Sequence, residues 1–76
     1  MTLKDVSEKQ VVLIKRLVGG FGQRRRLLGL GIYPGEAVRI LHNSVFGGPI
    51  LIEVRGNEVA IGKTVAADVE VEDLPK

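Results

Sequence analysis

The sequence lacks cysteine and tryptophan, has a single histidine, and is only 4% aromatic over its 76 residues. Without cysteine, neither a disulfide framework nor a thiolate metal site can form. No apolar stretch approaches the length of about twenty residues that a membrane-spanning helix requires. We therefore expect neither a membrane span nor a secretory leader, and we predict a cytosolic protein.

The shortness of the chain limits what it can build. Seventy-six residues predict a single domain, residues 1–76, which buries little more than half of the surface that the unfolded chain exposes. A deep catalytic cleft between two lobes is not expected in a domain of this size.

The residue patterns of enzymes are also missing. His42 is the only histidine, and no nucleophile or second ligand accompanies it in a recognisable arrangement. Gly62-Lys63-Thr64 resembles the end of a phosphate-binding loop, but the required first glycine would fall at Asn57. We predict no catalytic residue, no cofactor and no tight metal site.

Acidic residues alternate with valines near the end of the chain, at Asp68, Glu70 and Glu72. These carboxylates could hold a cation weakly, but alternating acids are also what the solvent-facing side of any strand shows. The pattern predicts a half-exposed strand rather than a metal site.

Short apolar runs separated by tight turns predict a mainly β domain. Strands are expected over 11–18, 37–43, about 50–54, around 59–61 and around 69–71, with a hairpin turn at Arg55-Gly56-Asn57 and one helical turn within 62–67. Five such strands suggest a small barrel that closes and removes its edges. Leu3 or Val6 is expected to pack under it. The predicted core is Val12 or Leu13, Leu27, Leu30, Val38, Ile40, Ile52, Val59, Ile61 and Val69.

The connector between the first two strands is long and carries three consecutive arginines and several leucines. Its sequence is GGFGQRRRLLGLGIYPG, residues 19–35. Strong helix formers predict a helix over 23–30, on which Leu27 and Leu30 share the core-facing side while Leu28 points away. Gly31 would end this helix in a left-handed conformation. Tyr33-Pro34-Gly35-Glu36 predicts a type II turn.

The connector is the candidate partner-binding surface, because an apolar side chain bordered by arginines is a common interface arrangement. The residues assigned to it are Arg24, Arg25, Leu28, Tyr33 and Pro34. Alternatively, the N-terminal segment folds over Leu28, and the arginines are merely solvated.

Charge leaves a second class of partner open. The net charge is +2, with basic residues concentrated early in the chain, at Lys15, Arg16, Arg24 to Arg26 and Arg39, and a run of acids later. Arginines near Phe21 and Tyr33 could meet the phosphates of a nucleic acid, although aromatics are few and no nucleic-acid motif is present.

The whole chain resembles the FeoA family, small cytosolic proteins associated with bacterial ferrous iron uptake. The resemblance rests on RRRLLGLGIYPG at 24–35, GGPILIEVRGNEVAIG at 47–62 and the A-x-x-V-x-V pattern at 66–71. It implies an SH3-like β barrel of about five strands, with one short helix between the first two strands and a single helical turn before the last.

The resemblance further implies a non-enzymatic accessory role beside a membrane iron transporter that carries a GTPase domain. Self-association remains open, as does the direction of any effect on transport. Because similar barrels form the C-terminal domain of iron-dependent repressors, a regulatory or nucleic-acid-binding module is the alternative. A direct iron carrier would need ligands that the sequence does not offer.

Overall fold

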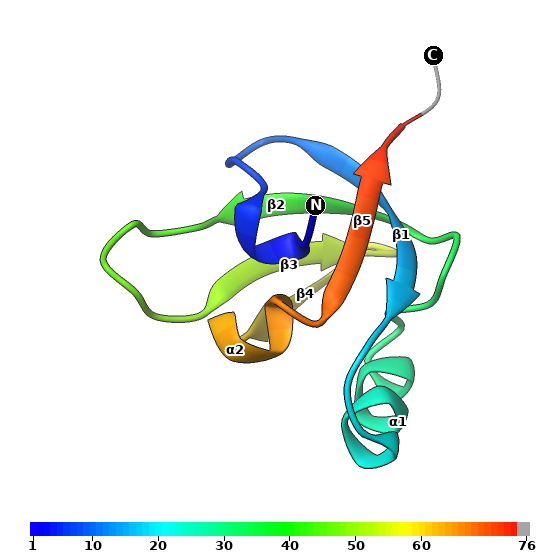
Figure 1. Ribbon diagram of the computed structural model, residues 1–76. Helices are drawn as coiled ribbons and strands as arrows, with labels where there is room; N and C mark the ends of the chain where they lie inside the picture. Colours follow the sequence, from blue (N-terminus) through cyan, green and yellow to red (C-terminus); the bar gives the residue numbers. More distant parts are fainter. Residues whose placement is uncertain (75–76) are drawn as a thin grey trace.

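Five antiparallel strands form one sheet in the order β4-β3-β2-β1-β5 in the computed structural model, which describes residues 1–74 (Figure 1). The last two residues of the predicted domain, Pro75 and Lys76, lie outside the described residues. The elements are η1 Leu3–Asp5, β1 Val11–Leu17, α1 Phe21–Gly29, β2 Ala37–His42, β3 Ile50–Val54, β4 Asn57–Ile61, α2 Lys63–Ala66 and β5 Val69–Asp73.

The expected elements are all found, with shifted ends. The connector helix begins two residues earlier than predicted and ends one residue earlier. The type II turn is confirmed by the positive φ of Gly35 and by the Glu36 N–H, which donates to the Tyr33 carbonyl at 3.0 Å. The β3–β4 hairpin closes through Arg55 and Gly56, both with positive φ, as a two-residue turn requires.

A register shift in β1 sets the inward and outward residues of its second half. Ile14 is buried, the next two residues, Lys15 and Arg16, are both exposed, and Leu17 is buried again. The extra outward residue is a β-bulge opposite β5, which bends the strand where the chain leaves the sheet. Arg16 consequently lies on the outer face, opposite Glu70 in register, while Leu17 turns inward.

The expectation that the sheet closes and removes its edges is wrong in part. Within residues 1–74, β4 and β5 are the two edges of the sheet and do not pair with each other; the chain passes between them through α2 (Figure 1). The N-terminus covers the free edge of β5: the Val71 N–H donates to the Met1 carbonyl at 2.9 Å, and Thr2 forms a β-bridge with Glu70. A short N-terminal segment thus satisfies part of an exposed edge.

The core lies between the curled sheet, η1, α1 and α2. It contains most of the predicted residues, with Val12 rather than Leu13 inside and Val59 only partly buried. Leu3 and Val6 both pack into it. The buried apolar residues are Leu3, Val6, Val12, Ile14, Leu17, Leu27, Ile32, Val38, Ile40, Ile50, Ile52, Val54, Ile61, Ala66, Val69 and Val71.

Leu30 is a wrong core prediction, since 42% of it is exposed. The helix ends at Gly29, and Gly31, at φ +88°, reverses the chain. The Ile32 N–H then donates to the Leu27 carbonyl at 3.1 Å, and the Gly31 N–H to the Leu28 carbonyl at 3.0 Å. This pairing is a Schellman motif, which brings Ile32 against Leu27 in the core and leaves Leu30 outside.

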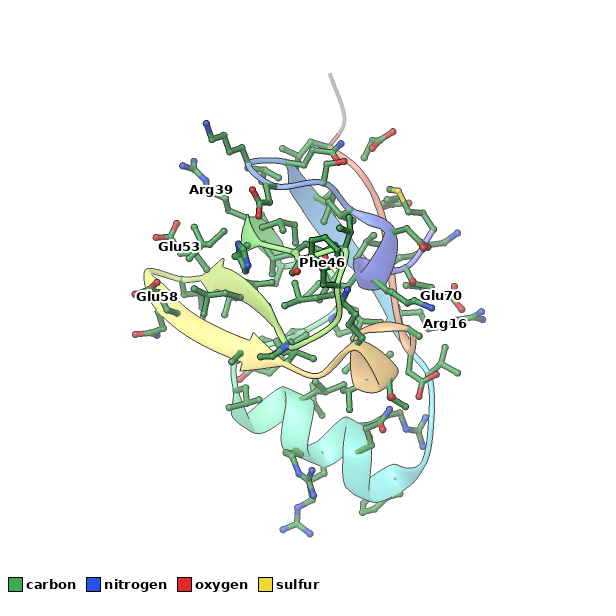
Figure 2. The ribbon with its side chains drawn as sticks, turned by 90° about the vertical axis from the view of Figure 1, so that its left-hand side faces the viewer. Arg16, Arg39, Phe46, Glu53, Glu58 and Glu70 are labelled. Atoms are coloured by element: carbon green, nitrogen blue, oxygen red, sulfur yellow. The ribbon has the colours of Figure 1, made fainter. Side chains whose placement is uncertain are left out.

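The sheet also mixes the charges that the sequence separates. Arg39 on β2 lies opposite Glu53 on β3, and Glu53 lies opposite Glu58 on β4, along one side of the molecule (Figure 2). Arg55 Nε donates to Glu36 Oε1 at 3.1 Å. The basic first half of the chain and its acidic second half therefore interleave in space, and the molecule is not divided into two charged halves.

Candidate functional site

The start of α1 has no side-chain N-cap and is held by hydrogen bonds to Asp68 instead. Gly20 occupies the cap position and offers no side-chain oxygen to the free amides. Gln23 Nε2 instead donates to Asp68 Oδ2 at 2.9 Å, and the Val18 N–H donates to the Asp68 carbonyl at 2.7 Å. Gly19, at φ +102°, fits this corner because a Cβ there would lie 2.6 Å from Gln23 Nε2.

One face of α1 points away from the core. Phe21, Arg24, Arg25 and Leu28 follow the spacing i, i+3, i+4, i+7, which places them along one side of a helix. Phe21 is 73% exposed and Leu28 39% exposed, whereas Leu27, one position before Leu28, is buried. The helix therefore presents a second apolar stripe, with arginines in it, to the outside.

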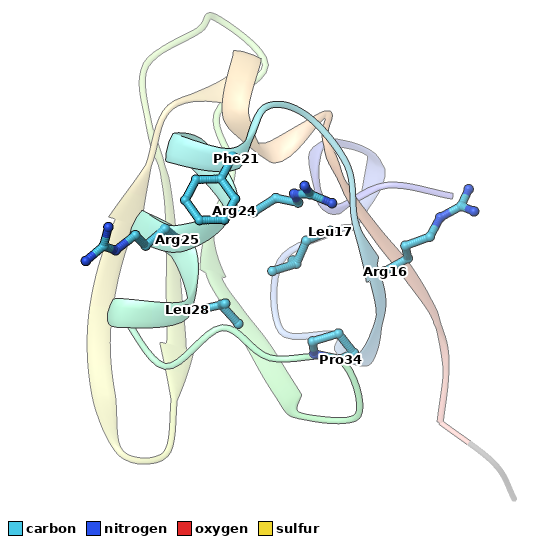
Figure 3. A pocket seen from close by; sticks show the side chains of 7 residues that line it. All are labelled: Arg16, Leu17, Phe21, Arg24, Arg25, Leu28 and Pro34. Atoms are coloured by element: carbon cyan, nitrogen blue, oxygen red, sulfur yellow. The ribbon is translucent and has the colours of Figure 1, made fainter.

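This face forms one wall of a groove of about 550 Å³ (Figure 3). The other wall comes from Arg16 and Leu17 at the end of β1 and from Pro34 in the turn after the helix. The apolar side chains of Leu17, Phe21, Leu28 and Pro34 line the groove. Its shape depends on the β-bulge, because the bulge turns Leu17 inward and Arg16 outward.

The rim of the groove is basic. The helix carries three consecutive arginines, Arg24 to Arg26, and no acidic residue. Within residues 1–74, no ion pair involves Arg24 or Arg25. Two guanidinium groups therefore stand beside an apolar surface without a carboxylate to neutralise them, a combination that favours an acidic, partly apolar partner.

Arg16 differs from the other two rim arginines because it has a partner. Arg16 Nη2 lies 2.7 Å from Glu70 Oε2 across the β1–β5 pair. This hydrogen bond lowers the pKa of Glu70 and raises that of Arg16. The pair with Glu70 largely balances the charge of Arg16, and the Arg16 guanidinium points away from the α1 side of the groove (Figure 3).

Four of the five predicted site residues meet in the groove: Arg24, Arg25, Leu28 and Pro34. Tyr33 does not line it, although Tyr33 is partly exposed in the same turn. The sequence prediction did not include Arg16, Leu17 and Phe21. The i, i+3, i+4, i+7 spacing from Phe21 could have indicated its place, whereas Arg16 and Leu17 reach the site only through the bulge.

The N-terminal segment does not cover Leu28. Its 3-10 helix, η1, lies beside β5 and α2, and none of residues 1–10 lines the groove. The alternative prediction, in which this segment folds over Leu28, is therefore wrong. The exposed position of Leu28 is available for contact with another molecule.

The other candidate ligands are dispersed. Among residues 1–74, no group of three histidine, aspartate or glutamate side chains is placed to hold a metal ion. His42 Nδ1 lies 2.8 Å from Glu8 Oε1 on the surface, and Asp68 and Glu70 are engaged with Gln23 and Arg16. Lys63, of the apparent phosphate-binding sequence, donates to the Ser44 carbonyl. That no metal site exists stays a prediction.

The short five-stranded antiparallel sheet, with a helical connector after its first strand, is the architecture of an SH3-like β protein. The groove beside α1 is its candidate protein-binding surface. Within the described residues, none of the helices has the length and apolar character needed to cross a membrane. The family model of the FeoA domain matches residues 1–73, and the chain therefore belongs to the FeoA family, which is associated with ferrous iron transport.

Individual relatives agree with this assignment. A protein of Methanocaldococcus jannaschii with the provisional name Fe(2+) transport protein A is 33% identical over 71 residues, covering 93% of this chain and 84% of the relative. The crystal structure of an iron uptake regulatory protein (FeoA) superimposes with a TM-score of 0.91 at 31% identity, with 97% of each chain covered. Zinc-complexed FeoA of Stenotrophomonas maltophilia, described as an SH3 domain protein, gives 0.79 at 29% identity, covering 95% of this chain and 89% of that one.

Proposed function

We propose that this chain is a non-enzymatic, cytosolic, single-domain accessory protein of ferrous iron uptake. In this proposal it binds the cytosolic GTPase domain of a membrane iron transporter and modulates transport. The observation that carries the proposal is the groove beside α1, in which an apolar surface occurs together with Arg24 and Arg25, which form no ion pair within residues 1–74. Membership of the FeoA family supports the connection with iron transport.

The chemistry of the groove favours a protein partner. A nucleic-acid surface needs a broad basic area that follows phosphates, often with aromatic side chains on which bases stack. Here the lining is mainly apolar, and its aromatic residue, Phe21, lines the same groove as Leu28. Such a site suits a protein segment that inserts a large apolar side chain and carries Asp or Glu next to it.

Substitution of Leu28 tests the proposal. We expect Leu28→Ala to weaken binding to the isolated GTPase domain by about tenfold or more, because an apolar anchor near the centre of an interface contributes most of its affinity. Titration calorimetry with and without guanine nucleotide measures this, and the melting temperature should change by only a degree or two. Leu30→Ala is the matched control, since Leu30 is similarly exposed but does not line the groove.

The arginines are expected to act on the rate of encounter. Replacing Arg24 and Arg25 by glutamate should slow association with the GTPase domain and weaken its dependence on salt, because rim charges steer diffusion. Stopped-flow association at two salt concentrations measures both effects. Wild-type binding by both this variant and Leu28→Ala would place the interface elsewhere; tight, steeply salt-dependent binding of an oligonucleotide would favour the nucleic-acid alternative.

A further inference from the structure

The two edges of the sheet differ in how they are covered. The N-terminus, through Met1 and Thr2, covers part of the free edge of β5. Among residues 1–74, β4 pairs with β3 alone and receives no such segment on its other side. β4 also contains no proline, no lysine and no bulge, which are features that keep edge strands from pairing. It is therefore a regular strand with an open edge.

The register of the β3–β4 hairpin determines which backbone groups face this edge. A two-residue turn closes on the pair of Val54 and Asn57. In such a hairpin this pair exchanges hydrogen bonds, as does every second pair after it. Glu58 and Ala60 lie between these pairs, so their N–H and C=O groups point away from β3. Both residues are exposed, and within residues 1–74 no hydrogen bond joins these groups to another segment. The edge thus has donors and acceptors available to an added strand.

A hollow of about 140 Å³ adjoins the C-terminal end of β4. Ala60 and Ile61 line it from the strand, and Arg26 and Leu30 line it from the connector, which lies below this end of β4 in Figure 2. Its volume is close to the roughly 150 Å³ of an engineered cavity that holds benzene. The hollow therefore has room for one aliphatic side chain, which would also cover the exposed Leu30.

The charge at the other end of β4 is negative. Glu58 lies directly opposite Glu53 in the hairpin, and like charges in such a pair are destabilising (Figure 2). Arg39 on β2 faces Glu53 from the other side, whereas Glu58 has no residue beyond it in the sheet and no ion pair within residues 1–74. A cationic side chain opposite Glu58 on an added strand would offset this repulsion. The edge therefore favours an apolar residue at one end and a basic residue at the other.

We propose that β4 binds an extended segment of a partner protein, which adds to the sheet as an antiparallel strand. This segment carries a large aliphatic residue opposite Ile61 and, three residues later, a lysine or arginine opposite Glu58. Its residues opposite Ala60 and Glu58 exchange backbone hydrogen bonds with β4. The residue opposite Ile61 points to the same side as Ile61 and enters the hollow. In strand addition the backbone bonds supply affinity and the side-chain contacts supply specificity.

A second copy of this chain does not meet these requirements. The symmetric register that uses the free groups of both copies pairs Glu58 with Ala60 of the second copy. This register brings Asn57 of the second copy opposite Ile61, so a short polar side chain faces the hollow and no cation faces Glu58. The partner segment is therefore a different sequence, with the aliphatic and basic residues named above.

Titration of the isotope-labelled protein with a short peptide, followed by NMR, tests the proposal. The probe is the blocked peptide acetyl-Thr-Leu-Thr-Val-Arg-Thr-amide, whose leucine and arginine have the required spacing. We expect it to shift the backbone amide signals of Glu58 and Ala60. Serine in place of the leucine, or glutamate in place of the arginine, should each weaken binding by about threefold or more.

Methylation of single peptide nitrogens distinguishes strand addition from other modes of binding. The N–H of the threonine between leucine and valine faces Ala60, so its methylation should weaken binding by about fivefold or more. The N–H of the valine points away from β4, so its methylation is the matched control and should leave the affinity unchanged. Equal effects of the two methyl groups overturn the proposal.

A charge exchange tests the position of the basic residue. Glu58→Lys should bind the arginine peptide about threefold more weakly and should prefer the peptide with glutamate in its place. Glu72→Lys is the control, because it makes the same change at an exposed residue of the opposite edge strand, and it should bind like the wild type. Equal binding of the arginine peptide by Glu58→Lys and the wild type overturns the proposed contact.

Other results of the same titration overturn the proposal. These are the absence of shifts in β4 at millimolar peptide, shifts confined to groove residues such as Phe21 and Leu28, and β4 shifts that depend on the concentration of the protein alone. The last result would assign the edge to a second copy. Because no transporter is present, failure of these tests leaves the proposed function untouched. Leu28→Ala, which tests that function, should bind the peptide like the wild type, since Leu28 does not line the hollow.

Discussion

The sheet and the α1 connector use apolar residues in different ways. β3 buries three of its five residues, Ile50, Ile52 and Val54, whereas α1 buries only Leu27 among its nine. β1 and β3 thus bury three side chains each and β2 and β5 two each, although the edge strand β4 buries only Ile61, while the helix is attached through a single buried side chain and through its ends. The comparison indicates that the sheet supplies most of the stability and that α1 supplies an accessible surface.

The composition of α1 is consistent with this division. Gly22 and Gly29 lie within the helix and lower its intrinsic stability, and no side chain caps its start. Gln23 at one end and the Gly31 turn at the other hold it to the rest of the molecule. A segment with few buried contacts is expected to open locally before the sheet does.

The largest effects on stability are expected from truncating a buried side chain in each region. Ile52→Ala and Leu27→Ala should each lower the free energy of unfolding by about 2 to 5 kcal/mol, since each leaves a cavity in packed apolar surroundings. Leu30→Ala, in the connector but exposed, should cost less than about 1 kcal/mol. Chemical denaturation measures all three, and an unchanged stability for Leu27→Ala would show that α1 is not anchored through this residue.

Two glycines of the connector should respond in opposite directions. Gly31→Ala should destabilise by about 1 to 2 kcal/mol, because its φ of +88° is unfavourable for a residue with a Cβ. Gly29→Ala should stabilise by up to about 1 kcal/mol, since Gly29 is helical and no atom lies within 4 Å of an added Cβ. Thermal melts of both variants measure the difference, and a shift in the same direction would contradict the assigned end of α1.

Acidification should modestly lower the stability of the folded protein, through protonation of Asp5 in η1 and of Glu70 in β5. Arg16 lowers the pKa of Glu70 below its ordinary 4.5, and hydrogen bonds from Thr2 lower the pKa of Asp5 below 3.8. A carboxyl with a lowered pKa in the folded state stabilises the protein above its unfolded pKa, and this contribution is lost as the pH falls through the folded pKa. The melting temperature should therefore decline as the pH falls below about 4.5.

The acid effect has a direct control. Glu70→Gln should flatten the low-pH decline, because the variant has no carboxyl to protonate at that position. Glu58→Gln is the matched change, since no ion pair in residues 1–74 involves Glu58. Equal pH profiles for the wild type and Glu70→Gln would mean that the Arg16 contact contributes nothing, as holds for many exposed ion pairs.

The smallest expected effect is the binding of metal ions, for which neither the sheet nor α1 offers a cluster of ligands among residues 1–74. Titration calorimetry with Fe²⁺ or Zn²⁺ should show at most weak binding, because His42 is the only histidine and the acids are dispersed or already bonded. Submicromolar, stoichiometric binding by the monomer would contradict this prediction. His42→Ala would then be the first variant to examine.

The sequence alone was sufficient for the strands, the turns and the family. Alternating apolar residues predicted β3 and β5, and the Pro34-Gly35 pair predicted a turn, because both signals depend on neighbouring residues only. The separation of Leu27 from Leu28 followed from helical periodicity, and the structure confirms it. Residue motifs also sufficed to recognise the FeoA family.

Tertiary structure decided which of these residues meet. The bulge in β1 turns Leu17 inward, and the Gly31 reversal puts Ile32 in the core in place of Leu30. The bulge depends on pairing with β5, which is distant in the chain. The reversal is made by hydrogen bonds within residues 27–32, but it departs from the helical periodicity that predicted a buried Leu30. The groove, built from α1, the end of β1 and Pro34, likewise exists only once the chain has folded.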